Sequence, residues 1–309
     1  MRLVKRAAQY LGILGGMAAV FFALGWFLMR SVQHSQPVHP TSRRLVRLVA
    51  VGDSLTQGVG DPQTAGGFVP LVARSLSHSA SVRLSTVNAG EAGDITSRVM
   101  DRINGNPQLQ RHLRQADIIT VTAGGNDALS AISAARKDLS RTDAKRLIAP
   151  AAATYTEHLR ALLERIRQLN RTAPVFVLGI YNPFYVELAT NSVLNTGVTT
   201  WNYTIRRVTR QQPNMYYVNI SRIGYGQYGQ TQPSRQLRQF AAANTPLLSS
   251  ASVSQLLVTA QGKNAWLSST DRLHPNERGY RYIAQQVTHR INQEQRRWLH
   301  HGTKTTTRP

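Results

Sequence analysis

The sequence contains no cysteine and few acidic residues. The absence of cysteine excludes disulfide bonds, a thiol nucleophile and a cysteine-ligated zinc site. The sequence has only 15 aspartate and glutamate residues but 37 lysine and arginine residues, which gives a formal net charge of +22. This excess favours contact with an anionic surface, such as lipid head groups, wall polymers or nucleic acid. The 309 residues, 41% of them hydrophobic, are enough to build a folded core.

The longest uncharged apolar stretch lies near the N-terminus, at Tyr10–Met29, with basic residues on both sides. About 20 apolar residues span a bilayer, so residues 1–30 are predicted to form a membrane anchor. A cleaved signal peptide is the alternative, but its apolar region would be shorter and no small-residue cleavage site follows Met29. Basic residues before the stretch favour a cytoplasmic N-terminus. We therefore expect a single-pass protein of the cell membrane whose main domain is extracytoplasmic.

Residues 31–44 are polar, contain two prolines in "SVQHSQPVHPTSRR" and are expected to form a linker. One domain is predicted over residues 45–299, followed by a polar tail over residues 300–309. Apolar runs typical of strands lie at Leu45–Val51, Val82–Val87, Ile118–Ala123, Val175–Ile180 and Met215–Ile220. Helical patterns lie between or after them at Phe68–Leu76, Thr96–Ile103, Ala151–Leu169, Val193–Arg210 and Asn276–Trp298. This alternation predicts an α/β fold with a parallel sheet covered by helices on both faces.

Two segments have no clear periodicity. Ala135–Leu147 is rich in charge, and Ser221–Gln239 is rich in glycine, glutamine and tyrosine. Both are expected to be surface loops or a flap over a site.

The first predicted strand ends in "VAVGDSLTQG", which places Ser54 at a strand end. A serine there is either a nucleophile or a helix cap, and a nucleophile needs a base. His274, in "DRLHP", is the one histidine of nine with an acidic residue three positions before it. Asp271 at that spacing would orient the imidazole and leave its other nitrogen free to accept a serine proton. The alternatives are that Asp271 caps the following helix or that His274 is an ordinary surface residue.

Two further strand ends offer hydrogen-bond donors. The segment "VNAGEAGD" contains Gly90, whose N–H can approach a ligand because no Cβ intervenes, and "VTAGGND" contains Asn126 with its side-chain amide. Gly90 as a turn glycine and Asn126 as a helix N-cap are the structural alternatives. Because carboxyl ends of parallel strands share one edge of a sheet, these groups are expected to meet there.

These segments resemble the sequence blocks of the GDSL, or SGNH, hydrolases. "GDSLTQG", "NAGEAG", "GGND" and "DRLHP" are similar to that family's blocks and occur in the same order between Val49 and Pro275. The resemblance implies a flavodoxin-like three-layer α/β/α fold with no cofactor and no metal. It implies Ser54 as nucleophile, His274 as general base and Asp271 as its orienting partner.

The same resemblance implies an oxyanion hole made by the N–H groups of Ser54 and Gly90 and the side chain of Asn126. The expected activity is that of a serine esterase or acylhydrolase, lipase-like or lysophospholipase-like, acting on small-molecule or lipid esters. An O-acetyl esterase of wall polysaccharide and an acyl-thioesterase are enzymatic alternatives. A tethered module that binds a polyanion is the non-enzymatic alternative, and no nucleic-acid motif is present.

Overall fold

The computed structural model describes residues 44–63, 66–135, 144–229, 232–245, 259 and 262–299. The predicted anchor and tail, and the linker up to residue 43, lie outside the described residues and stay predictions. Within the described part of the chain, no helix is long and apolar enough to cross a membrane.

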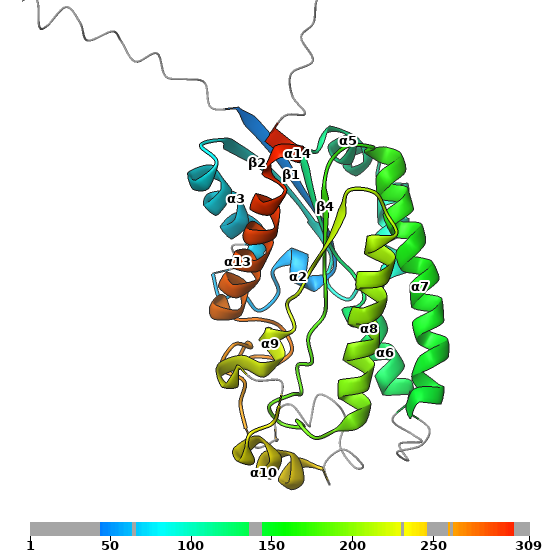
Figure 1. Cartoon of the computed structure of the whole chain (residues 1–309), viewed down its shortest axis with the longest axis vertical. Coiled ribbons are helices and arrows are strands. Elements are labelled where there is room, and N and C mark those ends of the chain that lie inside the picture. Colours follow the sequence, from blue (N-terminus) through cyan, green and yellow to red (C-terminus); the bar gives the residue numbers. More distant parts are fainter. Residues whose placement is uncertain are drawn as a thin grey trace, which may run out of the picture. The chain divides into compact units, whose positions relative to one another are not determined.

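The centre of the domain is a parallel sheet in the strand order β2-β1-β3-β4-β5 (Figure 1). The strands are β1 (Leu45–Gly52), β2 (Arg83–Gly90), β3 (Ile118–Thr122), β4 (Val175–Leu178) and β5 (Met215–Val218). Every residue of β3 and β4 is buried, since helices cover both faces of the sheet. The predicted α/β fold with a parallel sheet is confirmed.

Two layers of helices enclose the sheet (Figure 1). One face packs against α4 (Thr96–Gly105), α5 (Pro107–Gln115), α6 (Gly125–Ala135), α7 (Ala144–Leu169) and α8 (Ser192–Arg210). The other face packs against α3 (Phe68–Ser79), α13 (Glu277–Gln293) and α14 (Gln295–Leu299). Trp201 is fully buried in the first layer and Trp298 in the second.

Several boundaries differ from those expected. The predicted helix Asn276–Trp298 is divided at Glu294 into α13 and α14, and α5 was not anticipated because its only buried side chains are Leu109 and Leu113. The predicted loop Ser221–Gln239 contains α9 (Arg222–Tyr225), η2 (Gly226–Tyr228) and the start of α10 (Arg235–Asn244). Within Ala135–Leu147, residues 136–143 lie outside the described residues, and α7 begins at Ala144.

The direction of the chain connections changes between the neighbouring strands β1 and β3. After β1 the chain passes to the layer of α3, whereas after β3 it passes to the layer of α6 and α7. The loops that follow these neighbouring strands therefore diverge, which is where open α/β sheets bind their ligands.

Candidate active site

Ser54 lies directly beyond the carboxyl end of β1, as the first residue of the short helix α2 (Ser54–Gln57). Asp53 is the N-cap of α2: its carboxylate accepts from the Leu55 N–H at 3.0 Å and from the Thr122 hydroxyl at 2.8 Å. Burial raises the pKa of Asp53, and the hydrogen bonds from Thr122 and Leu55 act in the opposite direction. Since Asp53 caps the helix, the Ser54 hydroxyl is left for another partner.

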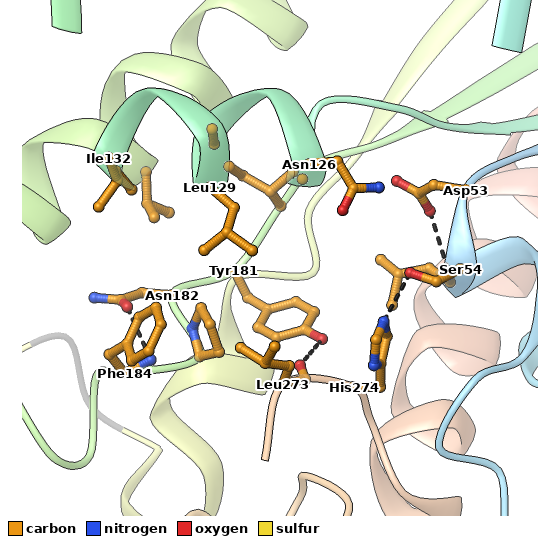
Figure 2. Close-up of a pocket in the computed structure, with 16 residues that line it drawn as sticks. Asp53, Ser54, Asn126, Leu129, Ile132, Tyr181, Asn182, Phe184, Leu273 and His274 are labelled. Carbon is orange, nitrogen blue, oxygen red and sulfur yellow. Dashed lines mark hydrogen bonds between the residues drawn. The ribbon is translucent and has the colours of Figure 1, made fainter. Parts of the chain in front are cut away.

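That partner is His274, whose Nε2 lies 2.8 Å from Ser54 Oγ (Figure 2). On the other side of the ring, His274 Nδ1 lies 2.6 Å from Asp271 Oδ2. The three side chains thus form one hydrogen-bonded chain, although Ser54 and His274 are 220 positions apart in the sequence. The helix-cap alternative for Asp271 is wrong, because Asn276 caps α13 by accepting from the Gly279 N–H.

The backbone of the Asp271–His274 turn fixes the carboxylate. Asp271 Oδ1 accepts from the N–H groups of Leu273 and His274, at 2.9 and 3.0 Å. Partial burial raises the pKa of Asp271, but the hydrogen bonds from His274 and Leu273 outweigh it and lower this pKa to about 2. Asp271 therefore stays ionised over the whole physiological pH range.

Asn126 belongs to the first turn of α6 rather than capping it, because α6 begins at Gly125. Its amide nitrogen donates to the Asp94 carbonyl at 2.8 Å. An amide group has two N–H donors, and the second has no acceptor among the described residues. Asn126 faces the same cavity as Ser54 and His274 (Figure 2).

Gly90 does not occupy the place expected for an oxyanion donor. Its N–H donates to the Asn88 side-chain oxygen at 3.1 Å, so this donor is already taken. A Cβ at Gly90 would lie 2.1 Å from the Gln57 backbone nitrogen, so glycine is needed here for the packing of β2 against α2. This packing requirement differs from the turn-glycine alternative, because Gly90 is the last residue of β2, and the prediction of Gly90 as a donor needs correction.

Gly93, three residues further along, has the properties expected of Gly90. Its φ is +84°, a Cβ there would meet no atom within 4 Å, and its N–H has no acceptor among the described residues. Its neighbour Asp94 accepts the Asn126 amide, which places this turn beside Asn126. The sequence signal was present, since "AGEAGD" contains both glycines, but their spacing alone did not distinguish them.

The model of the GDSL-like Lipase/Acylhydrolase family matches residues 50–282, a range that contains Ser54, Asn126 and His274. The chain belongs to the GDSL-like lipase/acylhydrolase family. It is therefore a carboxylic ester hydrolase, and this membership argues against the non-enzymatic binding module.

Individual relatives of this GDSL-like hydrolase are distant. The uncharacterized protein YpmR of Bacillus subtilis (strain 168) is 25% identical over 269 residues, which cover 85% of this chain and 89% of YpmR. The spore germination lipase LipC of Bacillus licheniformis is 29% identical over 149 residues, or 47% of this chain and 68% of LipC.

Solved structures share the fold of the hydrolase. The lipase Lip_vut3 from a goat rumen metagenome gives a TM-score of 0.58 at 21% identity, covering 78% of this chain and 95% of Lip_vut3. The acetyl xylan esterase AlAXEase gives a TM-score of 0.50 at 15% identity, covering 80% of this chain and 100% of AlAXEase.

A mostly apolar cavity of about 120 Å³ extends from Ser54 and His274 between α6 and the loop after β4. Figure 2 shows Ile132 and Phe184 across this cavity from Ser54, with Leu129 and Leu273 between them. Asn126, Leu129 and Ile132 follow one another at i, i+3 and i+6 on α6, so one face of this helix lines the cavity. Sequence reasoning did not anticipate these lining residues.

No group of three or more His, Asp or Glu side chains suited to a metal ion occurs in the described part of the GDSL-like hydrolase.

Proposed function

We propose that the enzyme hydrolyses carboxylic esters through an acyl-enzyme formed on Ser54. The hydrogen-bonded chain from Ser54 through His274 to Asp271 is the observation that carries this proposal. Ser54 Oγ forms a bond to the ester carbonyl carbon while His274 Nε2 takes the hydroxyl proton. The Asp271 carboxylate holds the imidazole in place and stabilises the imidazolium that results.

The ester C–O bond then breaks, and His274 gives its proton to the leaving alcohol. In the second half of the reaction His274 takes a proton from water, whose oxygen attacks the acyl carbon. Breakdown of this second tetrahedral intermediate releases the acid and restores the Ser54 hydroxyl with the proton from His274.

The negative charge that develops on the carbonyl oxygen needs donors placed before the reaction starts. We assign this role to the Ser54 N–H and the second N–H of the Asn126 amide, with Gly93 in place of Gly90 as a third donor. The N–H groups of Ser54 and Gly93 have no acceptor among the described residues, which supports this assignment.

The cavity favours a substrate whose acyl chain is longer than acetyl. Its walls are largely aliphatic and aromatic, and burying a methylene group stabilises a complex by about 0.8 kcal/mol. The net charge of +22 suits an ester that lies at an anionic lipid surface. A lysophospholipid or another medium-chain lipid ester is therefore the substrate class we propose.

The location of the enzyme is proposed from the sequence alone. The apolar stretch Tyr10–Met29 supports a single-pass anchor in the cell membrane, with the hydrolase domain extracytoplasmic. Protease accessibility of a C-terminal tag in intact cells tests this topology: a protected tag would contradict it.

The test of the mechanism is Ser54→Ala, measured on a chromogenic short-chain ester. The substitution removes the nucleophile, so hydrolysis should fall to the background rate while the protein stays folded. Ser130→Ala is the matched control, because Ser130 is exposed on α6 and should leave the rate unchanged. Activity retained by folded Ser54→Ala would reject the mechanism.

The substrate class is tested by comparing the full chain on a lysophospholipid, an O-acetylated wall glycan and an acyl-thioester. The highest kcat/KM is expected for the lysophospholipid. A preference for the glycan or the thioester would replace the proposed substrate class with that alternative and leave the role of Ser54 intact.

A further inference from the structure

Arg102 on α4 contacts three residues beside the site with one guanidinium group. Its Nη2 donates to the Gly52 carbonyl and its Nη1 to the Ala89 carbonyl, both at 2.8 Å. Its Nε donates to Asp94 Oδ2 at 2.9 Å, and Nη2 lies 2.8 Å from the same oxygen.

The three contacted residues lie in the segments that carry the proposed reacting groups or hold them in place. Gly52 is the last residue of β1, two positions before Ser54. Ala89 lies at the end of β2, where the chain turns towards Gly93. Asp94 is the residue whose carbonyl accepts the Asn126 amide. The guanidinium therefore connects the nucleophile turn to the turn that holds Asn126.

Arginine is suited to this position in a way that lysine is not. Its guanidinium is planar and offers five N–H donors in a fixed arrangement, whereas an ammonium group is a compact charge on a flexible stem. The side chain of Arg102 is 25% exposed and that of Asp94 is 16% exposed, so water screens their ion pair only in part. Charge-assisted hydrogen bonds in such surroundings are shorter and stronger than neutral ones.

We propose that Arg102 is a positioning residue for ester hydrolysis, which fixes the oxyanion donors relative to Ser54. This inference rests on the proposed function. Arg102 is not part of the cavity lining and does not touch the substrate position, so its effect passes through Gly52, Ala89 and Asp94.

A positioning role makes a specific kinetic prediction. The substrate binds through the apolar cavity, which Arg102 does not contact, whereas the transition state also needs the aligned donors. Loss of Arg102 should therefore lower kcat and leave KM nearly unchanged. A displacement of about 1 Å in such a site costs about 10²-fold in rate.

The experiment compares Arg102→Met and Arg102→Lys with the control Arg98→Met in the full chain. Arg98 lies one turn earlier on α4 and is exposed, and its side chain has no hydrogen bond or ion pair with the described residues. For each variant we would measure kcat, KM and the thermal midpoint of unfolding. We would also measure two inhibition constants, one for an alkyl boronic acid that mimics the tetrahedral intermediate and one for the product acid.

For Arg102→Met we expect kcat to fall about 10²-fold, with boronic acid affinity falling in parallel and product acid affinity unchanged. Arg102→Lys should recover part of the loss, and Arg98→Met should match the parent enzyme. Unchanged kcat in folded Arg102→Met, or an effect confined to KM, would overturn the inference. So would a loss of kcat without a loss of boronic acid affinity.

Asp94→Asn is the second variant, for use if Arg102→Met fails to fold. It removes the carboxylate charge and keeps a side-chain oxygen, so a smaller fall in kcat with unchanged KM is expected, and an unchanged kcat would overturn the inference. Ser54→Ala separates the two proposals: if folded Ser54→Ala retains activity, the proposed function fails. If Ser54→Ala is inactive and folded Arg102→Met is fully active, only the role of Arg102 fails.

Discussion

Asn126 shows at the scale of a single residue how one side chain serves both the fold and the proposed chemistry. One N–H of its amide is taken by the Asp94 carbonyl at 2.8 Å, which fixes the orientation of the group. The other N–H has no acceptor among the described residues and belongs to a residue that lines the cavity. A donor held in this way needs no reorganisation when charge develops on the substrate.

Asn126→Ala should lower kcat by roughly 10²–10³-fold, because one oxyanion donor is lost. The control is Asn106→Ala, which removes the N-cap of α5 and should cost about 1 kcal/mol of stability without changing kcat. Steady-state kinetics and urea unfolding of both variants check these outcomes. An unchanged kcat in Asn126→Ala would leave this residue with a structural role only.

The site residues that could be predicted from the sequence are those whose residue type and spacing are distinctive. Asp271 and His274 stand three positions apart in front of a proline, and Ser54 follows a buried apolar run. Their proximity in the structure agrees with that prediction. Gly93 was not anticipated, because the packing environment of a glycine cannot be deduced from its sequence neighbours. The hydrogen bonds of Arg102 could not be predicted from the sequence either, since their acceptors Ala89 and Gly52 lie 13 and 50 positions away.

At the scale of elements, strands were easier to predict than helices. The apolar runs that became β1 and β3 agree with the predicted ranges to within one residue, because both strands are buried on two faces. Helix α10 was missed because its sequence is mostly glutamine, arginine and alanine, with Leu237 as its largest fully buried side chain. A helix with so narrow an apolar face has almost no periodic signal.

We expect the face of α6 that lines the cavity to determine which acyl-chain lengths the enzyme accepts. Ile132 lies at the end of the cavity that is remote from Ser54, as does Phe184 (Figure 2). Ile132→Trp should exclude the distal part of a long acyl chain. Loss of about three buried methylenes corresponds to roughly 2–3 kcal/mol, or about 50-fold in the octanoate-to-acetate ratio of kcat/KM.

Hydrolysis of a series of p-nitrophenyl esters measures this ratio, with Ile132→Val as the conservative control. The acetate ester should be hydrolysed by Ile132→Trp at close to the parental rate. An unchanged octanoate-to-acetate ratio would mean that the acyl chain lies elsewhere.

At the scale of the whole molecule, the buried carboxyl group of Glu187 links stability to pH. Glu187 is 1% exposed, and its Oε2 has no hydrogen-bond partner among the described residues. Burial raises the pKa of Glu187 from 4.5 to about 7, and the charge of Arg272 acts in the opposite direction. The folded protein therefore binds this proton more tightly than the unfolded chain does.

The sign of the effect follows from this difference. Stability from the protonated Glu187 is fully present below pH 4.5 and is lost as the pH rises through about 7. Glu187→Gln cannot ionise, so its free energy of unfolding relative to that of the parent should rise from pH 4 to pH 8, by up to about 3 kcal/mol. Urea unfolding at both pH values checks this, with the exposed Glu157→Gln as control. An equal difference between parent and Glu187→Gln at both pH values would contradict it.

The most direct test of the central claim is to locate the acyl group on the enzyme during turnover. The parent enzyme is mixed with a p-nitrophenyl ester, quenched in acid within the first turnovers, digested and examined by mass spectrometry. We expect an added acyl mass on the peptide that contains Ser54, and none in Ser54→Ala. An acyl group on another residue, or rapid hydrolysis by folded Ser54→Ala, would contradict the account.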